Sequence, residues 1–233
     1  MRVLIVDTAL GACTACVVED GRVLGVRSEL MTKGHQERLA GMVRDAVADA
    51  AKEAGGGFEA LDRIGVTVGP GSFTGLRVGL AFAQGLGAAL DRPVVGLSTL
   101  DGLAISIKPA GVVAAVIAAR RGQVYVRLFR DGRPLGQAEA LSLEMAAERI
   151  SDAAASAPPI LVGSGASLLV ETFPERLGAA VTARLPAPLP EALAYMTAVV
   201  DPTAAPPRPL YLRAPDAVPP SRLPGQPRAP ATS

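Results

Sequence analysis

Residues 69–90 read GPGSFTGLRVGLAFAQGLGAAL and join a glycine-rich turn to an apolar helix. Small side chains recur every four residues along this helix, and positions four apart share one helix face. They are Gly75, Gly79, Ala83 and Gly87. Each glycine costs a helix about 1 kcal/mol relative to alanine, so a closely packed partner must offset that cost. The sequence therefore predicts a helix that begins at an N-cap, Ser72, and whose small-residue face another subunit covers.

The turn before this helix resembles a phosphate-binding loop but lacks the residues of the two common motifs. No Lys-Ser or Lys-Thr pair follows at the Walker A spacing, and Thr74 stands where the dinucleotide fingerprint has its last glycine. Backbone amides at a helix start still attract anions. Gly69 and Gly71 are therefore candidates for a nucleotide or anion contact.

Length and charge narrow the class of protein. A chain of 233 residues can hold one large domain or two small ones. Its formal net charge of +1 provides no global basic field of the kind that dominates nucleic-acid binding. No apolar run approaches the roughly 20 residues of a membrane span, and the first residues resemble a strand rather than a signal peptide. We expect a soluble cytoplasmic protein without a membrane partner.

The two cysteines, Cys13 and Cys16, form a C-x-x-C pair within a predicted strand. Residues three apart in a strand point to opposite faces. The two sulfurs therefore cannot share a metal or form a disulfide, and no second C-x-x-C completes a zinc site. We expect two small, semi-buried thiols.

Hydrophobic periodicity and turn residues predict a similar order of elements in each half of the chain. Asp-Gly hairpin turns occur at 20–21 and again at 131–132, and at the same offset Arg22, Leu24 and Gly25 recur, which indicates an internal duplication. The expected strands are 2–7, 12–19, 23–29, 64–68, 93–97, 112–118, 123–129 and 160–162; the expected helices are 33–54, 72–90, one from about 99, 143–154 and 190–200.

Three antiparallel strands followed by alternating helices and strands, repeated once, is the pattern of a tandem ribonuclease-H-like fold, as in actin and the sugar kinases. We predict an α/β protein with two such actin-like (ASKHA) domains and mixed five-stranded sheets. Residues 1–109 form the first domain, and 110–200 form a reduced second domain whose last helix packs back on the first. Residues 201–233 form a Pro-rich segment, disordered after about 214, because six prolines fall in the last 20 residues.

Asp7 ends the first strand, where ATPases of this fold hold metal-bound water, and Thr8 follows it in the turn. The alternative is that Asp7 caps the next turn. The equivalent position in the second half is Ala118, which offers no acid. Phosphoryl transfer needs a held metal, so the chain has no expected intrinsic cofactor. ATP or ADP at the cleft or at a partner interface stays open, with Asp7, Thr8, Gly69 and Gly71 as its contacts.

His35 is the single histidine, and Leu39 stands four residues on, where a zinc-binding helix carries its second histidine. We therefore expect no metal site. One histidine and no Gly-x-Ser-x-Gly elbow also leave no nucleophile triad, so no catalytic residue is assigned. Near a helix start, His35 is expected either to meet solvent and cap its turn or to contact a partner.

Seven segments of the chain resemble the bacterial TsaB (YeaZ) family, which takes part in making threonylcarbamoyladenosine in tRNA. The block from GPGSFTGLR to GLSTL is specific, and the others support it. The segments are 4–9 (LIVDTA), 35–39 (HQERL), 69–79 (GPGSFTGLRVG), 83–86 (AQGL), 96–100 (GLSTL), 120–125 (RRGQVY) and 211–213 (YLR).

The resemblance implies a tandem actin-like protein without catalysis of its own. In that family the catalytic paralogue TsaD carries the metal ligands, TsaB binds TsaD through its first two long helices, and the ATPase TsaE joins the pair. tRNA is an indirect partner through the complex, and whether it touches this chain stays open. The implied interface comprises His35, Leu39, Met42, Gly75, Gly79, Ala83 and Gly87. Gly79→Leu is thus expected to abolish association and leave the monomer folded.

Two rivals and two departures from the family accompany this interpretation. The chain could instead be an ATP-dependent small-molecule kinase of the same fold, or it could form a homodimer through the same helix face when alone. Ala118 and Gln123 stand where relatives have acids, and the Pro-rich tail exceeds the family pattern.

Overall fold

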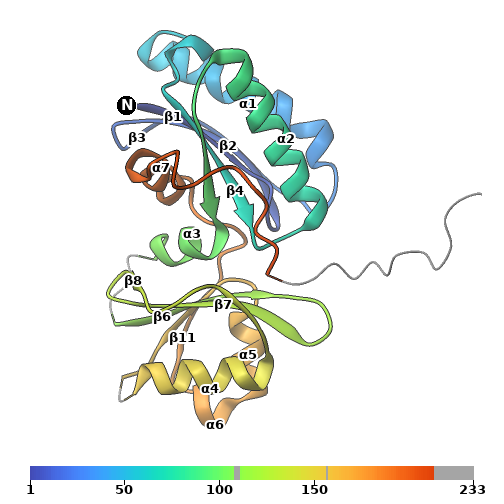
Figure 1. Cartoon of the computed structure of the whole chain (residues 1–233), viewed down its shortest axis with the longest axis vertical. Helices are drawn as coiled ribbons and strands as arrows, with labels where there is room; N and C mark the ends of the chain where they lie inside the picture. Colours follow the sequence, from blue (N-terminus) through green and yellow to red (C-terminus); the bar gives the residue numbers. More distant parts are fainter. Residues whose placement is uncertain (108–110, 156, 213–233) are drawn as a thin grey trace, which may run out of the picture.

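The computed structural model describes residues 1–107, 111–155 and 157–212, which form two sheet-based halves (Figure 1). The first half holds a five-stranded mixed sheet in the order β3-β2-β1-β4-β5. Strands β1, β2 and β3 pair antiparallel, whereas β1, β4 and β5 pair parallel. The strands are β1 (Arg2–Asp7), β2 (Ala12–Glu19), β3 (Arg22–Leu30), β4 (Arg63–Gly69) and β5 (Val94–Ser98).

Helices cover both faces of this first sheet. α1 (His35–Ala54) and α2 (Phe73–Leu90) lie side by side on one face, and a single 3-10 turn, η1 (Phe58–Ala60), precedes β4 (Figure 1). The opposite face is covered by α7 (Pro190–Val199), which comes from the far end of the chain. Packing between the layers is apolar, because β1 and β2 are buried along almost their full length. The last helix therefore belongs to the core of the first half.

The second half repeats the strand order of the first. Its sheet runs β11-β10-β6-β7-β8, and β9 also pairs with β7. The predicted five strands are thus six, because two short strands, β8 and β9, share the outer edge of β7. The strands are β6 (Val112–Ala118), β7 (Gln123–Arg130), β8 (Arg133–Pro134), β9 (Glu139–Ser142), β10 (Ile160–Val162) and β11 (Val181–Ala183).

Helices α4 (Leu143–Ala154), α5 (Ala166–Thr172) and α6 (Pro174–Leu177) cover one face of the second sheet, and α3 (Thr99–Ile105) covers the other. α3 and α7 therefore lie between the two sheets (Figure 1). Both predicted Asp-Gly hairpin turns are present: Asp20 and Gly21 have φ of 48° and 83°, and Asp131 and Gly132 have 49° and 77°. The shared strand order and the shared turns make this the tandem ribonuclease-H-like, actin-like fold that the sequence predicted.

The predicted opposite orientation of the two cysteines is confirmed, but both are fully buried and not semi-buried. Both cysteines are free and buried, and they lie in different cores: Cys13 faces α1, and Cys16 faces α7. Burial raises the pKa of Cys13 to about 11 and that of Cys16 to about 12. Neither thiol is a ready nucleophile at neutral pH.

Residues 201–212 lie along the first half of the protein. The Gly96 amide donates to the carbonyl of Ala205 over 2.8 Å, and the Leu210 amide donates to the carbonyl of Val68 over 2.8 Å. The start of the predicted Pro-rich segment is therefore bound to β4 and β5. The disorder expected beyond about 214 concerns residues outside the described ranges.

Among the described residues, one helix, α2, is long and apolar enough to cross a membrane. The structure packs it against β4, with further contacts to β1 and β5. That arrangement is typical of a helix on the core of a globular domain.

Candidate functional site

The small-residue face of α2 packs against the protein's own first sheet. A Cβ added at Gly75 would lie 2.0 Å from the carbonyl oxygen of Thr8, and one at Gly79 would lie 2.4 Å from the Thr8 hydroxyl oxygen. Ala83 is fully buried, and Gly87 packs on β5. The prediction that another subunit covers this face is wrong. The glycines instead let the α2 backbone approach the turn that follows β1.

That turn is held to the start of α2 by two hydrogen bonds. The Thr8 hydroxyl donates to the Gly75 carbonyl over 2.7 Å, and the Ser72 amide donates to the Ala9 carbonyl over 2.7 Å. Ser72 also caps the helix, as predicted, because its hydroxyl oxygen accepts from the Gly75 amide over 3.2 Å. A Cβ at Gly71 would lie 2.3 Å from the Ala9 carbonyl oxygen. The loop that resembles a phosphate cradle therefore binds the protein's own backbone.

Asp7 is fully buried at the centre of this contact. Its Oδ1 accepts from the Ala9 amide over 2.9 Å and from the Thr67 hydroxyl over 2.7 Å. Burial raises the pKa of Asp7, while the hydrogen bonds from Thr67 and Ala9 and the nearby His35 lower it; the net shift is upward. Asp7 thus caps the turn after its strand, which is the alternative that the sequence left open.

The four residues predicted to contact a nucleotide lie together, but the side chains of Asp7 and Thr8 are not accessible to solvent. Asp7 and Thr8 are buried, and positions 69 and 71 face backbone carbonyls of Leu210 and Ala9. The structure therefore does not offer Asp7 or Thr8 to a nucleotide. The four positions serve to attach α2.

The raised pKa of Asp7 makes one prediction about pH. The stability that protonated Asp7 contributes is fully present below the pKa of the unfolded chain, near 4, and is lost as pH rises through the higher folded value. Asp7→Asn keeps an oxygen for Ala9 and Thr67 but cannot titrate. Acidification from pH 7 to roughly pH 4.5 should therefore stabilise the parent relative to Asp7→Asn.

Urea unfolding of both proteins at several pH values measures this difference. The shifts of the other carboxylates cancel in the comparison because both proteins share them. A parent-minus-variant difference that stays constant across the range would contradict a raised pKa for Asp7.

The three α1 residues predicted at the interface are also buried. His35 begins α1 and is 7% exposed, while Leu39 and Met42 belong to the core between α1 and the sheet. The expectation that His35 meets solvent is wrong. The expectation that His35 and Met42 lie on an exposed interface is wrong too. The helix turns these side chains inward because His35, Leu39 and Met42 share its sheet-facing side.

An exposed apolar groove lies between α1 and α2, beside the predicted set. It has a volume of about 530 Å³. Its rim includes Phe73, which is 54% exposed and carries the guanidinium of Arg77 3.8 Å from its ring centroid. The lining residues are Gln36, Leu39, Phe73, Thr74, Arg77, Val78, Ala81 and Phe82. Of the predicted interface residues, Leu39 alone is among them.

A second row of small residues continues from this groove along the exposed side of α2. Ala81, Gly85 and Ala88 are exposed, and a Cβ added at Gly85 would meet no atom within 4 Å. These residues have helical spacing too, so the sequence contained the signal. Its spacing is less regular than that of the glycine row, which recurs every four residues.

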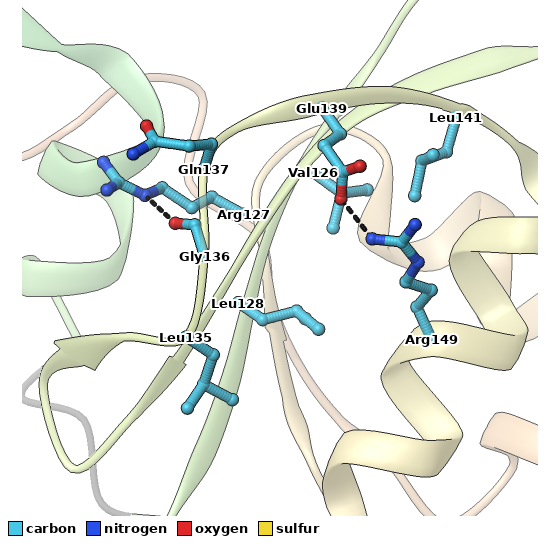
Figure 2. Close-up of a pocket in the computed structure, with 9 residues that line it drawn as sticks. All are labelled: Val126, Arg127, Leu128, Leu135, Gly136, Gln137, Glu139, Leu141 and Arg149. Atoms are coloured by element: carbon cyan, nitrogen blue, oxygen red, sulfur yellow. Dashed lines mark hydrogen bonds and ion pairs between the residues drawn. The ribbon is translucent and has the colours of Figure 1, made fainter.

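A much smaller pocket lies in the second half, between β7, the 135–139 segment and α4. Figure 2 shows Arg149 and Glu139 paired across it, and Arg127 donating to the Gly136 carbonyl over 3.1 Å. Its volume is about 70 Å³, far below the several hundred Å³ of a typical ligand site. The α1–α2 groove is therefore the better candidate site. Within the described part of the chain, no group of three or more His, Cys, Asp or Glu residues could hold a metal ion.

The chain is similar to proteins that are named for the modification of tRNA. Residues 17–157 match the family model described as TsaD, tRNA N6-adenosine threonylcarbamoyltransferase. An uncharacterized protein of Mycobacterium tuberculosis is 39% identical over 222 residues, which cover 93% of this chain and 94% of that protein. The tRNA threonylcarbamoyladenosine biosynthesis protein TsaB of Escherichia coli is 37% identical over 128 residues, which cover 54% of this chain and 53% of that protein.

The solved structure of YeaZ from Pseudomonas aeruginosa superposes with a TM-score of 0.73 and 31% identity, covering 91% of this chain and 99% of that one. Its coverage extends across both halves, so the whole tandem arrangement is shared. The chain therefore belongs to the TsaB (YeaZ) family.

Proposed function

We propose that this chain is a non-catalytic subunit of the complex that forms threonylcarbamoyladenosine in tRNA, and that it binds the catalytic paralogue TsaD through α1 and α2. The observation that carries the proposal is the exposed apolar groove between these helices. Exposed apolar surface rimmed by polar residues marks interaction sites, and here Gln36, Thr74 and Arg77 border the apolar side chains. The proposed process, formation of threonylcarbamoyladenosine in tRNA, follows the names of the E. coli relative and of the matched family model.

The chemistry of the groove suits a helical partner. Phe73, Val78 and Phe82 supply apolar contact, and aromatic residues are enriched at the energetic centres of interfaces. The adjacent row of Ala81, Gly85 and Ala88 would let a partner helix approach the α2 backbone. The proposed interface thus uses the two helices that the family resemblance implied, but a different side of α2.

In this proposal the chain acts by positioning TsaD. The ATPase TsaE joins the pair, tRNA is met through the complex, and any ATP or ADP is held at the partner interface. Without TsaD, two copies would use the same groove as a homodimer. All of this takes place in the cytoplasm.

The test is reconstitution of tRNA modification from purified TsaD, TsaE and tRNA, with and without this chain. We expect modification to require the chain, and we expect the chain alone to turn over no ATP. An equal rate without it would contradict the subunit role. Magnesium-dependent ATP turnover by the chain alone, lost in Asp7→Ala, would favour the small-molecule kinase instead.

A further inference from the structure

The outer edge of the first sheet is open along β3. This strand pairs with β2 on one side, and among the described residues no strand pairs with its other side. The Met31 amide donates to the Gly11 carbonyl over 3.1 Å, just beyond the β2–β3 pair. Along an antiparallel pair, successive residues direct their backbone groups alternately toward and away from the neighbouring strand. Leu30, Ser28 and Val26 therefore direct their amides and carbonyls away from β2.

This open edge carries exposed apolar side chains. Leu30 is 77% exposed and Val26 is 41% exposed. An edge strand of this kind can pair with a strand of another chain. The Val26 carbonyl accepts from Nη1 of Arg27 over 2.7 Å, but a backbone carbonyl has two lone pairs. The edge is thus able to form a further ladder of hydrogen bonds.

We propose that β3 pairs with β3 of a second copy of this chain, antiparallel and about a two-fold axis at Ser28. The two five-stranded sheets then join into one. In this register the outward backbone groups meet: Ser28 exchanges two hydrogen bonds with Ser28 of the second copy, and Val26 exchanges two with Leu30 of the second copy. The surface is therefore self-complementary in its backbone.

The side chains specify the same register. Arg27 lies opposite Glu29 of the second copy, and on the other face Val26 lies opposite Leu30 of the second copy. Opposite charges and apolar pairs across strands stabilise a sheet, whereas like charges directly opposite destabilise it. A shift of two residues would place Arg27 opposite Arg27 in one direction and Glu29 opposite Glu29 in the other. The order of charges in β3 therefore favours pairing centred on Ser28.

The charges of α1 extend this complementarity. Arg27 pairs with Asp49 of α1, and Glu29 pairs with Arg38 of α1. Across the joined edge, the Arg38–Glu29 pair of one copy meets the Arg27–Asp49 pair of the other. Four charges of alternating sign then lie in a row, once on each side of the two-fold axis. Surface ion pairs contribute more in such a network than in isolation.

The β3 edge is separate from the α1–α2 groove, because no residue that lines the groove belongs to β3. Pairing through β3 is therefore compatible with TsaD, or with a second copy, bound in the groove. Only that compatibility rests on the proposed function.

Self-association through β3 is measured in the Ala81→Arg chain, because the added charge blocks pairing through the groove. We expect the weight-average mass from analytical ultracentrifugation to rise with concentration toward that of a dimer. A monomer at every concentration would overturn the proposal.

Charge reversal in this background tests the register. Glu29→Arg makes positions 27 and 29 both positive, and Arg27→Glu makes both negative. Like charges then face each other in each homodimer, so each variant alone is expected to stay monomeric. An equimolar mixture should form a heterodimer, because opposite charges face each other at both positions. A mixture that stays monomeric, or single variants that dimerise as the background does, would overturn the proposal.

Arg22→Glu is the matched control for these reversals. Arg22 also belongs to β3 and pairs with Glu53 of α1, as Arg27 pairs with Asp49, but it lies outside the paired residues 26–30. This control should self-associate as the background does. An equal loss of association in it would overturn the assignment to residues 26–30.

Hydrogen exchange locates the contact on the backbone. The amides of Val26, Ser28 and Leu30 should gain protection as the protein associates, because only in the dimer do they donate to another strand. Dimerisation without that protection would overturn β3 pairing. Retention of TsaD binding in Ala81→Arg would instead contradict the groove of the proposed function and leave these comparisons valid, because all the compared proteins carry that substitution.

Discussion

Gly75→Ala is expected to lower the free energy of unfolding by about 3 kcal/mol, the upper range for overpacking a filled interior. The added methyl would lie 2.0 Å from the Thr8 carbonyl oxygen, which is backbone and cannot rotate away. α2 must then shift from the turn after β1, and the hydrogen bond from the Thr8 hydroxyl to the Gly75 carbonyl is lost with it. Urea unfolding, with the slope of the transition checked for constancy, measures the loss.

Gly85→Ala is the matched control, because it makes the same substitution in the same helix. An added Cβ at Gly85 meets nothing within 4 Å, so the helix propensity of alanine should stabilise the protein by up to about 1 kcal/mol. The two substitutions are thus expected to have opposite signs. A Gly75→Ala protein as stable as the parent would contradict the packing of α2 on Thr8.

The contact between α2 and Thr8 also changes the expected result of Gly79→Leu. The sequence predicted a folded monomer that no longer associates. A Cβ there would lie 2.4 Å from the Thr8 hydroxyl oxygen, and leucine is far larger than a methyl group. The substitution should therefore damage the fold of the first half. A loss of association in Gly79→Leu would say nothing about an interface, because it would follow from unfolding.

Ala81→Arg is expected to weaken binding to TsaD at least 100-fold and to leave the monomer folded. Ala81 is exposed and lines the groove, so arginine extends into solvent in the free protein. In the complex the charge would be buried without a partner, at a cost of about 3 kcal/mol, which corresponds to more than a hundredfold in affinity. Titration calorimetry with purified TsaD measures the change.

Leu168→Arg in α5 is the control for Ala81→Arg. Leu168 is 40% exposed and belongs to α5. Figure 1 shows α5 in the second half, away from α1 and α2. This variant should bind TsaD as the parent does, and both variants should keep the unfolding midpoint of the parent. Parental affinity in Ala81→Arg would contradict the groove as the interface.

Local patterns were sufficient for much of the fold. The ranges predicted for β6, β10 and α4 agree with Val112–Ala118, Ile160–Val162 and Leu143–Ala154. These elements could be predicted because apolar periodicity and flanking turns depend only on residues that are close together in the sequence. η1, β8, β9, β11, α5 and α6 were not predicted. Each is short, and a short element depends on the sheet and helices around it more than on its own propensity.

The sequence by itself determined the longer helices and strands, the duplicated strand order, the opposite orientation of the two thiols and which residues share a face of α2. It did not determine which of two small-residue faces of α2 is free. A helical repeat specifies a face but not its neighbour, and the neighbour of Gly75 and Gly79 is Thr8, on a turn far away in the chain. Only the tertiary structure decided that the glycine row is buried in the protein's own core. It left the row of Ala81, Gly85 and Ala88 exposed.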